Sequence, residues 1–275
     1  MQPSVVAHRG ASTHRAEHTL AAYALALEQG AQGLECDVRL TRDGHLVCVH
    51  DRRVDRTSSG RGVVSTLTLE RMSELDFGSW HTPPSEPAGG PARQPDHPAA
   101  RHRGVLTLEA LLGLVADTPG TRLFVETKHP VRYGALVEAT LLAQLRQHGL
   151  AAPSSKEDSP VVVMSFSALA VRRMRRFAPA LPTVLLLAAI PPSRRDGSLP
   201  AYADYTGPDI RLLRADPGYV ARSAARGHDT YCWTVDDPSD VLLCQRLGVR
   251  FLATNSPAAT RAVLDANPGG TVGFR

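Results

Sequence analysis

Short apolar runs alternate along the chain with longer segments in which apolar and polar positions are mixed. Several runs are apolar at nearly every position, as expected for the strands of a parallel sheet that is covered on both faces. Eight strands are predicted on this basis: Val5–His8, Gly33–Leu40, Leu123–Lys128, Val161–Phe166, Thr183–Leu187, Ile210–Leu213, Thr230–Val235 and Phe251–Thr254. A further run, Leu46–Val49, follows the Asp43-Gly44 turn and is predicted to extend the second strand as a hairpin.

The segments between the strands are predicted to be helices. Three of them end close to a glycine or proline, namely Leu20–Gln29, Leu108–Ala116 and Arg132–His148. In the last third of the chain, a capping residue precedes proline at three predicted helix starts: Asp216-Pro217, Asp237-Pro238 and Ser256-Pro257. Gly227 and Gly248 are predicted to close the first two of these helices. Eight strand–helix steps favour one α/β domain, residues 1–275, folded as a (β/α)8 TIM barrel rather than an open sheet.

One region interrupts the alternation. Residues 52–105 lie between the predicted hairpin and the third strand, as a Pro/Gly-rich insertion after the second strand. Their middle, Thr82–Gly104, holds six prolines and three glycines without hydrophobic periodicity, which favours a loop or disorder. Trp80 precedes this stretch, and two interpretations stay open for it: packing over the mouth of a site, or packing on the barrel rim.

Composition and charge narrow the class of protein. Hydrophobic residues make up 43% of the 275 residues, which is enough for a sizeable core. The four cysteines form no CxxC pair and are predicted to be reduced core residues: Cys36, Cys48, Cys232 and Cys244. The net charge of +4 comes mostly from arginine, with a cluster at residues 172–176. No aromatic residues interleave with this cluster, so we interpret it as the solvated face of a helix and expect no nucleic-acid partner. The buried side of that helix is predicted to comprise Leu169, Met174 and Phe177.

The N-terminus and the length of the apolar runs bear on location. Residues 1–4 lack the basic segment and the long apolar stretch of a leader. No apolar run approaches the roughly 20 residues that a bilayer-spanning helix requires. We therefore expect a cytoplasmic protein without stable membrane insertion, provided that Met1 is the true start. The sequence does not predict the oligomeric state.

The stretch from Gly33 to Asp51 carries the strongest chemical signal. Glu35 and Asp37 are two residues apart in a predicted strand, so their carboxylates point to the same face. Adjacent carboxylates repel each other and are costly to bury. A divalent cation would hold them together, and oxygen ligands suit Mg²⁺ or Ca²⁺. We therefore expect one such cation.

Two other predicted strands end in residues that suit the same site. The first strand delivers His8 and Arg9, and the third places Glu126 and Lys128 on one face. Such barrels carry their active sites at the C-terminal ends of the strands, so these side chains are expected to converge with those of the second strand.

Each residue type suggests a role at this site. We interpret Glu35, Asp37 and Glu126 as metal ligands. Arg9 and Lys128 suit the binding of phosphate oxygens, because both are cationic donors. His8 and His50 suit the exchange of a proton during phosphoryl transfer. The alternative for the three acids is a buried salt-bridge network with the Arg and the Lys.

The motifs occur in a defined order: HRG at 8–10, ExD at 35–37, DG at 43–44, HD at 50–51 and ExK at 126–128. This ordered set resembles the glycerophosphodiester phosphodiesterase family, and the resemblance runs from His8 to about Pro257. Further segments resemble family motifs, namely Glu17-His18-Thr19-Leu20, Leu75–Trp80 and Trp233-Thr234-Val235. The insertion at 52–105 also matches the place where this family carries one. The resemblance implies a TIM barrel and the activity of a phosphoric diester hydrolase.

The resemblance also implies a reaction and further roles. The expected reaction is metal-dependent hydrolysis of a small-molecule glycerophosphodiester to sn-glycerol 3-phosphate and an alcohol such as choline. In this family the attacking group can be the glycerol 2-hydroxyl, which gives a cyclic phosphate that water later opens. Glu17 is expected to orient a histidine or a substrate hydroxyl, with a helix N-terminal role as the alternative. Trp233 is expected to border the glycerol, with core packing as the alternative.

Two positions depart from the family pattern, and two other functions stay open. His18 stands where the family usually has Asn, and Asn255 where it often has Asp. Both are expected to affect substrate fit or metal affinity. A phospholipase D-like lipid phosphodiesterase of the sphingomyelinase D type would need an exposed apolar rim and secretion. A non-catalytic phosphate-binding barrel would be expected to lack one histidine or one metal carboxylate, whereas all five are present.

Overall fold

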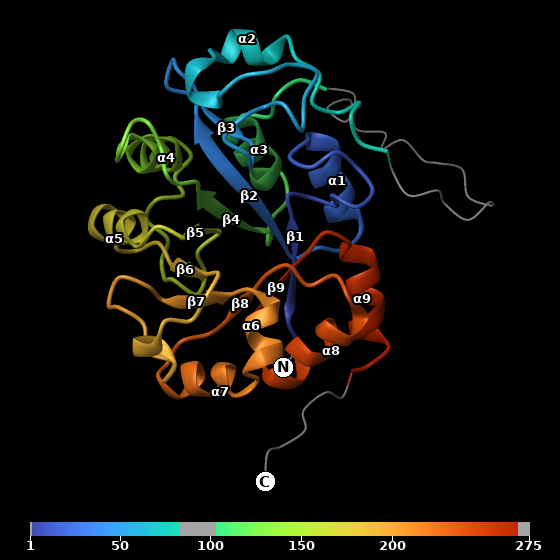
Figure 1. The fold of residues 1–275 in the computed structure, drawn as a ribbon, viewed down its shortest axis with the longest axis vertical. Coiled ribbons are helices and arrows are strands. Elements are labelled where there is room, and N and C mark those ends of the chain that lie inside the picture. Colours follow the sequence, from blue (N-terminus) through green and yellow to red (C-terminus); the bar gives the residue numbers. More distant parts are fainter. Residues whose placement is uncertain (1, 83–102, 269–275) are drawn as a thin grey trace, which may run out of the picture.

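The computed structural model describes residues 2–82 and 103–268. Eight parallel strands pair side by side in the order β7-β6-β5-β4-β2-β1-β9-β8, and isolated parallel bridges from Thr206 to Thr230 and from Asp209 to Trp233 join the two ends. The strands occupy the centre of the molecule and the helices surround them (Figure 1). They are β1 (Ser4–His8), β2 (Gly33–Leu40), β4 (Arg122–Thr127), β5 (Val161–Ser165), β6 (Thr183–Leu187), β7 (Tyr205–Pro208), β8 (Tyr231–Cys232) and β9 (Phe251–Thr254). The predicted (β/α)8 barrel is confirmed.

The helices between the strands vary in length. They are α1 (Leu20–Glu28), α2 (Leu69–Ser73), α3 (Leu108–Ala116), α4 (Leu136–Gln147), α5 (Ala168–Phe177), α6 (Ile210–Ala215), α7 (Gly218–Ala225), α8 (Pro238–Leu247) and α9 (Pro257–Asp265), with 3-10 turns η1 (Val64–Thr66) and η3 (Pro192–Arg194). None of the helices in the described ranges is both long and apolar enough to cross a membrane.

The barrel interior is filled by large apolar side chains, which form the floor below the strand ends. Its buried members include Phe124, Met164, Leu186, Tyr231 and Phe251. The strands twist around this cluster, and separate apolar clusters lie between the strands and the surrounding helices. The interior is therefore a packed core, and any ligand must bind above it at the C-terminal ends of the strands.

The predicted strand Ile210–Leu213 is wrong, because these residues begin α6 and the strand at this place is β7. The Asp209 carboxylate accepts a hydrogen bond from the Arg211 N–H at 2.8 Å and caps the helix. A short apolar run does not distinguish a strand from a helix, and glycine and proline obscured the true strand. Gly207 is required in that strand, because a Cβ there would lie 2.7 Å from the Leu186 side chain.

The predicted helix boundaries in the last third are partly confirmed. The Asp237 side chain caps α8, and Gly248 ends it with a φ of 80°. Gly227 also has a left-handed backbone. Asp216, in contrast, lies at the end of α6 and does not cap α7. Ser256 precedes α9 without a side-chain capping bond, because its hydroxyl bonds Thr13 instead.

The arginine-rich helix α5 buries a different face from the one predicted. Met174 is buried as expected, but Leu169 and Phe177 are 60% and 51% exposed. The buried stripe runs through Ala170, Val171 and Met174 at helical spacing, and it leaves both predicted core residues outside. All four cysteines are buried and unpaired, as predicted.

The predicted hairpin is present, and part of the insertion is described. Strand β3 (Leu46–Cys48) pairs antiparallel with the end of β2. The described residues after it, up to 82, include α2 and η1 and form a small apolar cluster with the β3 side chains, as Val47, Met72 and Phe77 illustrate. The stretch predicted to be a loop or disordered, Thr82–Gly104, lies mostly outside the described residues.

Candidate active site

Three carboxylates meet at the C-terminal ends of β2 and β4. In the strand register Asp37 pairs with Glu126, and Glu35 pairs with His8 of β1. Glu35, Asp37 and Glu126 are buried, and one oxygen from each lies within 4.8 Å of the others. We call these three residues the acidic cluster. The cluster brings together all three residues that the sequence predicted as metal ligands.

Two basic side chains contact the acidic cluster. Lys128 Nζ lies 2.8 Å from a Glu126 oxygen and 3.2 Å from an Asp37 oxygen. Arg9 Nε lies 3.2 Å from the other Asp37 oxygen. The salt-bridge network that the sequence left open is therefore present, centred on Asp37. It does not exclude a cation site, because Glu35 has no basic side-chain partner among these contacts other than His8 at 4.0 Å.

The pKa values of the three acids are shifted in opposite directions. Burial would raise the pKa of Asp37, but the charge of Lys128, a hydrogen bond from His18 and the charge of Arg9 outweigh burial and hold it well below the usual range. Burial and the Asp37 charge raise the pKa of Glu35, and the same two causes raise that of Glu126 to about 8. The basic groups of the protein thus stabilise the ionised form of Asp37, but they do not supply enough positive charge to do the same for Glu35 and Glu126. A hard divalent cation fits this set of oxygen donors, because it would supply the missing charge.

Arg9 is held in place by its backbone as well as its side chain. Its φ of 59° is left-handed, and the turn continues through Gly10, where a Cβ would lie 2.6 Å from the Ala22 backbone of α1. The turn directs the Arg9 N–H to a Glu35 oxygen at 3.0 Å. The HRG sequence therefore ends β1 in a tight turn that brings Arg9 over the acidic cluster.

Glu17 has a different partner from those expected. Its carboxylate accepts hydrogen bonds from Arg9 at 3.1 Å and from two nitrogens of Arg56, each at 2.8 Å. Burial would raise its pKa, but the Arg56 bonds and the Arg9 charge lower it to about 2. Glu17 contacts neither predicted catalytic histidine through a hydrogen bond in the described structure. It positions two arginines, a role that no local signal in the sequence indicated for Arg56.

His8 is oriented by Asn255. The Asn255 Nδ2 donates to Asp236 at 2.6 Å, so its Oδ1 faces the His8 Nδ1 at 2.8 Å. Nδ1 therefore carries the proton, and Nε2 faces the acidic cluster with a free lone pair. Burial and the Arg9 charge lower the pKa of His8 to about 3, so the ring is neutral at pH 7. The Asn255 departure from the family pattern thus lies in direct contact with a predicted catalytic residue.

His50 is oriented by a carboxylate. Its Nδ1 lies 2.7 Å from an Asp51 oxygen, and the other Asp51 oxygen accepts a hydrogen bond from Arg56 Nε at 2.7 Å. Burial lowers the pKa of His50, and the charges of Arg9 and Lys128 add to this effect while Asp37 opposes it. The Asp51 pKa is lowered to about 2, since bonds from Arg56 and His50 outweigh its burial. The Nδ1 of His50 therefore bonds an ionised carboxylate, whereas the Nδ1 of His8 bonds a neutral amide.

His18 is a further functional residue that the sequence marked only as a departure. Its Nε2 lies 2.9 Å from an Asp37 oxygen, and its Nδ1 lies 2.8 Å from the Tyr23 hydroxyl. That hydroxyl donates its own proton to the Glu35 carbonyl at 3.0 Å. Both His18 nitrogens thus face oxygen atoms, one on Tyr23 and one on Asp37.

The site opens into a cavity of about 250 Å³. One side is polar and includes His8, Arg9, His50 and Lys128, and the other side is apolar. On the apolar side Trp233 donates its indole N–H to the Gly207 carbonyl at 2.8 Å, and its ring meets Phe166 edge to face at 5.2 Å. Trp233 therefore presents a fixed apolar surface to the cavity, and it also packs against the apolar cluster of the barrel interior, so its place next to a substrate stays a prediction.

Trp80 lies close to this cavity without lining it. Its ring packs against the Arg56 guanidinium at 5.9 Å, and Arg56 in turn holds Glu17 and Asp51. The neighbouring His81 bonds the Ser12 carbonyl at 3.2 Å. These contacts link Trp80 through Arg56 to Glu17 and Asp51, and both interpretations of Trp80 stay predictions.

Comparison with known proteins identifies the chain's relatives. Residues 8–259 match the model of the "Glycerophosphoryl diester phosphodiesterase family". A "Probable glycerophosphodiester phosphodiesterase 1" of Mycobacterium tuberculosis is 52% identical over 98% of this chain and 95% of its own length. The "Glycerophosphodiester phosphodiesterase" of Bacillus subtilis is 34% identical over 92% of this chain and 83% of its own length.

Solved structures share the fold. A phosphodiesterase of Oleispira antarctica, described in complex with the product sn-glycerol-3-phosphate, superposes with a TM-score of 0.78 at 24% identity, covering 96% of this chain and 97% of that one. A glycerophosphoryl diester phosphodiesterase named as putative, from Silicibacter pomeroyi, gives 0.77 at 25% identity, covering 96% and 94%. The family model and the close relatives confirm the resemblance seen in the motifs: the chain belongs to the glycerophosphoryl diester phosphodiesterase family.

Proposed function

We propose that the chain hydrolyses glycerophosphodiesters to sn-glycerol 3-phosphate and an alcohol, in a reaction that depends on one divalent cation. The names of its relatives support the substrate class. The observation that carries the proposal is that Glu35, Glu126, two basic side chains and two imidazoles line one cavity, with Asp37 next to the two acids in the acidic cluster. A non-catalytic barrel would be expected to lack one of the two histidines or one of the three carboxylates, whereas this chain has all five.

The acidic cluster would hold the cation, Mg²⁺ or Ca²⁺. When bound, such an ion neutralises phosphate charge and lowers the pKa of a hydroxyl that it binds. Arg9 and Lys128 line the same cavity, and they bind the non-bridging phosphate oxygens. Trp233 and Phe166 border the carbon skeleton of the glycerol and limit the access of water from that side.

The two histidines take different parts because their partners differ. His8 has a free Nε2 lone pair and a neutral amide behind it, so we assign it as the proton acceptor. The negative phosphate offsets the Arg9 charge that lowers the His8 pKa, and it thereby makes His8 more basic in the complex. His50 bonds the ionised Asp51, which stabilises its imidazolium, and the negative phosphate offsets the Arg9 and Lys128 charges that lower the His50 pKa, so we assign His50 as the proton donor.

The bonds change in two steps. First the glycerol 2-oxygen attacks phosphorus and its proton passes to His8, while the bond to the alcohol oxygen breaks and His50 protonates that oxygen. The product is a cyclic phosphate. Water then attacks phosphorus and gives its proton to His50, while the bond between phosphorus and the glycerol 2-oxygen breaks and His8 returns its proton to that oxygen. Both histidines end the cycle in their starting states.

A lipid phosphodiesterase remains the second candidate, because one observation favours it. Phe166 lines the cavity and is 42% exposed, and Leu169, also exposed, follows it at the start of α5. The exposed ring of Phe166 offers an apolar contact at the cavity for an acyl chain of a lysolipid. A lysolipid is therefore one of the substrates that test the proposal.

The test uses protein freed of metal with EDTA and assayed with and without added Mg²⁺ or Ca²⁺. The substrates are glycerophosphocholine, glycerophosphoethanolamine and lysophosphatidylcholine, with release of glycerol 3-phosphate and of choline as readouts. We expect glycerol 3-phosphate from the first two substrates only when a cation is restored. Glu126→Gln should abolish this activity, and the matched variant Glu109→Gln, at an exposed position of α3, should retain it.

Three results would contradict the proposal. Choline release from lysophosphatidylcholine without hydrolysis of glycerophosphocholine would favour the lipid phosphodiesterase. Binding of glycerol 3-phosphate without turnover of any substrate would favour a phosphate-binding barrel. Full activity in the presence of EDTA would exclude the cation from the reaction.

A further inference from the structure

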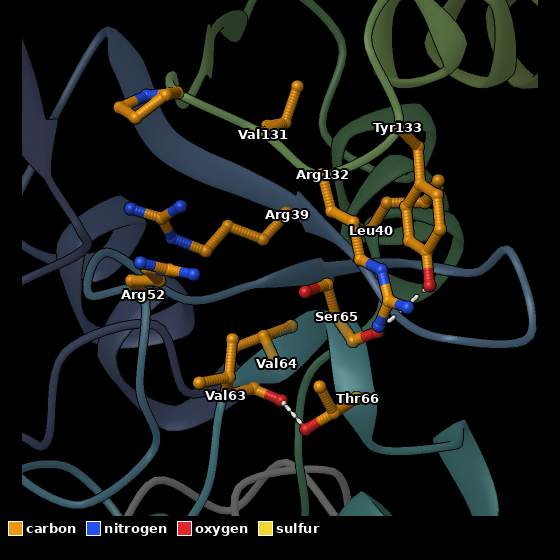
Figure 2. A pocket seen from close by; sticks show the side chains of 11 residues that line it. Arg39, Leu40, Arg52, Val63, Val64, Ser65, Thr66, Val131, Arg132 and Tyr133 are labelled. Carbon is orange, nitrogen blue, oxygen red and sulfur yellow. Dashed lines mark hydrogen bonds between the residues drawn. The ribbon is translucent and has the colours of Figure 1, made fainter.

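A second and larger cavity lies beside the active site. Its volume is about 460 Å³, compared with about 250 Å³ for the catalytic cavity. It is enclosed by the end of β2, the η1 turn and the loop between β4 and α4 (Figure 2). All three segments lie at or after the C-terminal end of a barrel strand, so the cavity opens on the same side of the barrel as the active site.

The cavity is basic. Three arginines line it, and no acidic residue is found among its lining, all of which the structure describes. Arg39, Arg52 and Arg132 form no ion pair with a carboxylate of residues 2–82 or 103–268 at 4.0 Å or less. We call this cavity the arginine pocket. Positive charges that line a hollow and form no ion pair attract an anion, and guanidinium groups suit phosphate and carboxylate.

The arginines stand at two ends of the pocket. Figure 2 shows Arg39 extended along the pocket with its guanidinium pointing to the same end as that of Arg52. Arg132 lies at the other end, packed against the Tyr133 ring at 5.6 Å, and the Tyr133 hydroxyl donates to the Ser65 carbonyl at 3.0 Å. The last bond ties the β4–α4 loop to η1, so the pocket has a fixed wall.

Arg39 connects the pocket to the active site. It follows Asp37 by two residues on β2, so both side chains point to one face about 6–7 Å apart along the strand. Its Nε and one terminal nitrogen donate to the His50 carbonyl at 2.9 and 2.7 Å. The arginine pocket thus meets the catalytic cavity at His50, whose backbone carbonyl bonds Arg39 and which also lines the catalytic cavity.

We propose that the arginine pocket binds a second anionic group, a phosphate or carboxylate carried by the alcohol portion of the diester. This proposal rests on the function proposed above, in which His50 protonates the departing alcohol. An alcohol that leaves on the His50 side extends toward Arg39. Apolar walls from Val63, Val64 and Val131 can pack against the carbon atoms that separate the two anionic groups. Diesters whose alcohol bears a negative charge are therefore the preferred substrates.

The test compares two diesters that differ by one anionic group: glycerophosphoglycerol, and the same compound phosphorylated on its terminal hydroxyl. We expect kcat/KM to be about tenfold or more higher for the phosphorylated diester, because charge-assisted bonds to arginine are among the stronger ones. In the double variant Arg52→Gln with Arg132→Gln, this ratio should fall to about one. Arg53→Gln is the matched control, because Arg53 is exposed, pairs with Asp55 and lies outside the pocket.

Binding supplies a readout that does not depend on turnover. Calorimetric titration of the His8→Ala protein should show the same preference for the phosphorylated diester, and the double arginine variant should lose it. If the wild-type protein hydrolyses neither diester, the proposed function fails, while the calorimetric preference still decides the ligand of the pocket. Equal kcat/KM values and equal affinities for the two diesters would overturn the proposal.

Inorganic phosphate distinguishes a substrate group from a free anion. If the pocket binds a group of the substrate, inorganic phosphate should inhibit the hydrolysis of glycerophosphoglycerol equally in the wild-type protein and in the double variant. Loss of phosphate sensitivity in the double variant, with no change in the ratio between the two diesters, would show a site for a free anion and overturn the proposal.

Discussion

The acidic cluster and the arginine pocket are neighbours on β2, but their charges are compensated in different ways. Asp37 is buried and contacts Arg9, His18 and Lys128. Arg39, two residues later, is half-buried and bonds only a backbone carbonyl among the described contacts. The protein's own basic side chains thus balance the negative charge of Asp37, whereas the positive charge of the arginine pocket is left for a ligand.

This difference separates residues that the fold needs from residues that a ligand needs. A charge with buried partners affects stability and activity together, because its removal leaves those partners unpaired. A charge that faces an open pocket affects the choice of ligand and little else. Four variants test this distinction, from the largest expected effect to the smallest.

Asp37→Asn should have the largest effect. It removes a predicted cation ligand and leaves two basic side chains without a full negative charge. We expect hydrolysis of glycerophosphocholine to fall by about 1,000-fold or more. The free energy of unfolding should fall by about 3–5 kcal/mol, measured by urea denaturation. A variant of unchanged stability would show that the Asp37 contacts are not needed, and the exposed Asp55→Asn should keep both properties.

Substitution of each histidine by alanine should separate the proton donor from the acceptor. With glycerophosphocholine, His8→Ala and His50→Ala should each lower kcat by about 100- to 10,000-fold. With a nitrophenyl ester of glycerol phosphate, the departing group needs no proton, so His50→Ala should recover most activity and His8→Ala should not. The assay follows nitrophenolate absorbance. Recovery in His8→Ala instead would reverse the assignment.

Glu17→Gln should affect stability in a way that depends on pH. The Glu17 pKa is lowered from 4.5 to about 2, so its ion pairs stabilise the fold fully above pH 4.5 and lose their effect as pH falls toward 2. At pH 7 the variant should lose about 3 kcal/mol of unfolding free energy. Urea denaturation from pH 7 down to pH 3.5 should show the difference shrinking. A difference that stays constant over this range would contradict the ion pairs as its cause.

Arg52→Gln should have the smallest effect on the fold. Arg52 is exposed and has no carboxylate partner in the described structure, so its removal should change the unfolding free energy by no more than about 0.5 kcal/mol. Urea denaturation at pH 7 measures this change. A loss as large as that expected for Asp37→Asn would mean that the pocket's arginines are structural, and it would remove the contrast between the two regions.

Most of the fold and the centre of the site could be predicted, because both depend on local patterns. Continuous apolar runs marked the buried parallel strands, and Glu35 with Asp37 on one strand face indicated a shared ligand. Strand β7 was missed, since Gly207 and Pro208 are poor strand formers, although packing against Leu186 requires glycine at position 207. Tertiary contacts therefore make this segment a strand although its local strand propensity is low.

The partners of the site residues could not be predicted in the same way. Asn255 reaches His8 across 247 positions of sequence, and Arg56 reaches Glu17 across 39. No spacing rule connects such residues, because their proximity depends on how the loops above the barrel fold. The arginine pocket is a further case, since its three arginines come from separate segments.

The most direct test of the account is a crystal structure of the protein soaked in Ca²⁺ or Mn²⁺, with anomalous scattering used to locate the ion. The account predicts one ion with an oxygen of each of Glu35, Asp37 and Glu126 at roughly 2.0–2.6 Å. His8 and His50 should lie on the cavity that contains it. The absence of an ion there, with Lys128 still bridging Asp37 and Glu126, would contradict the account.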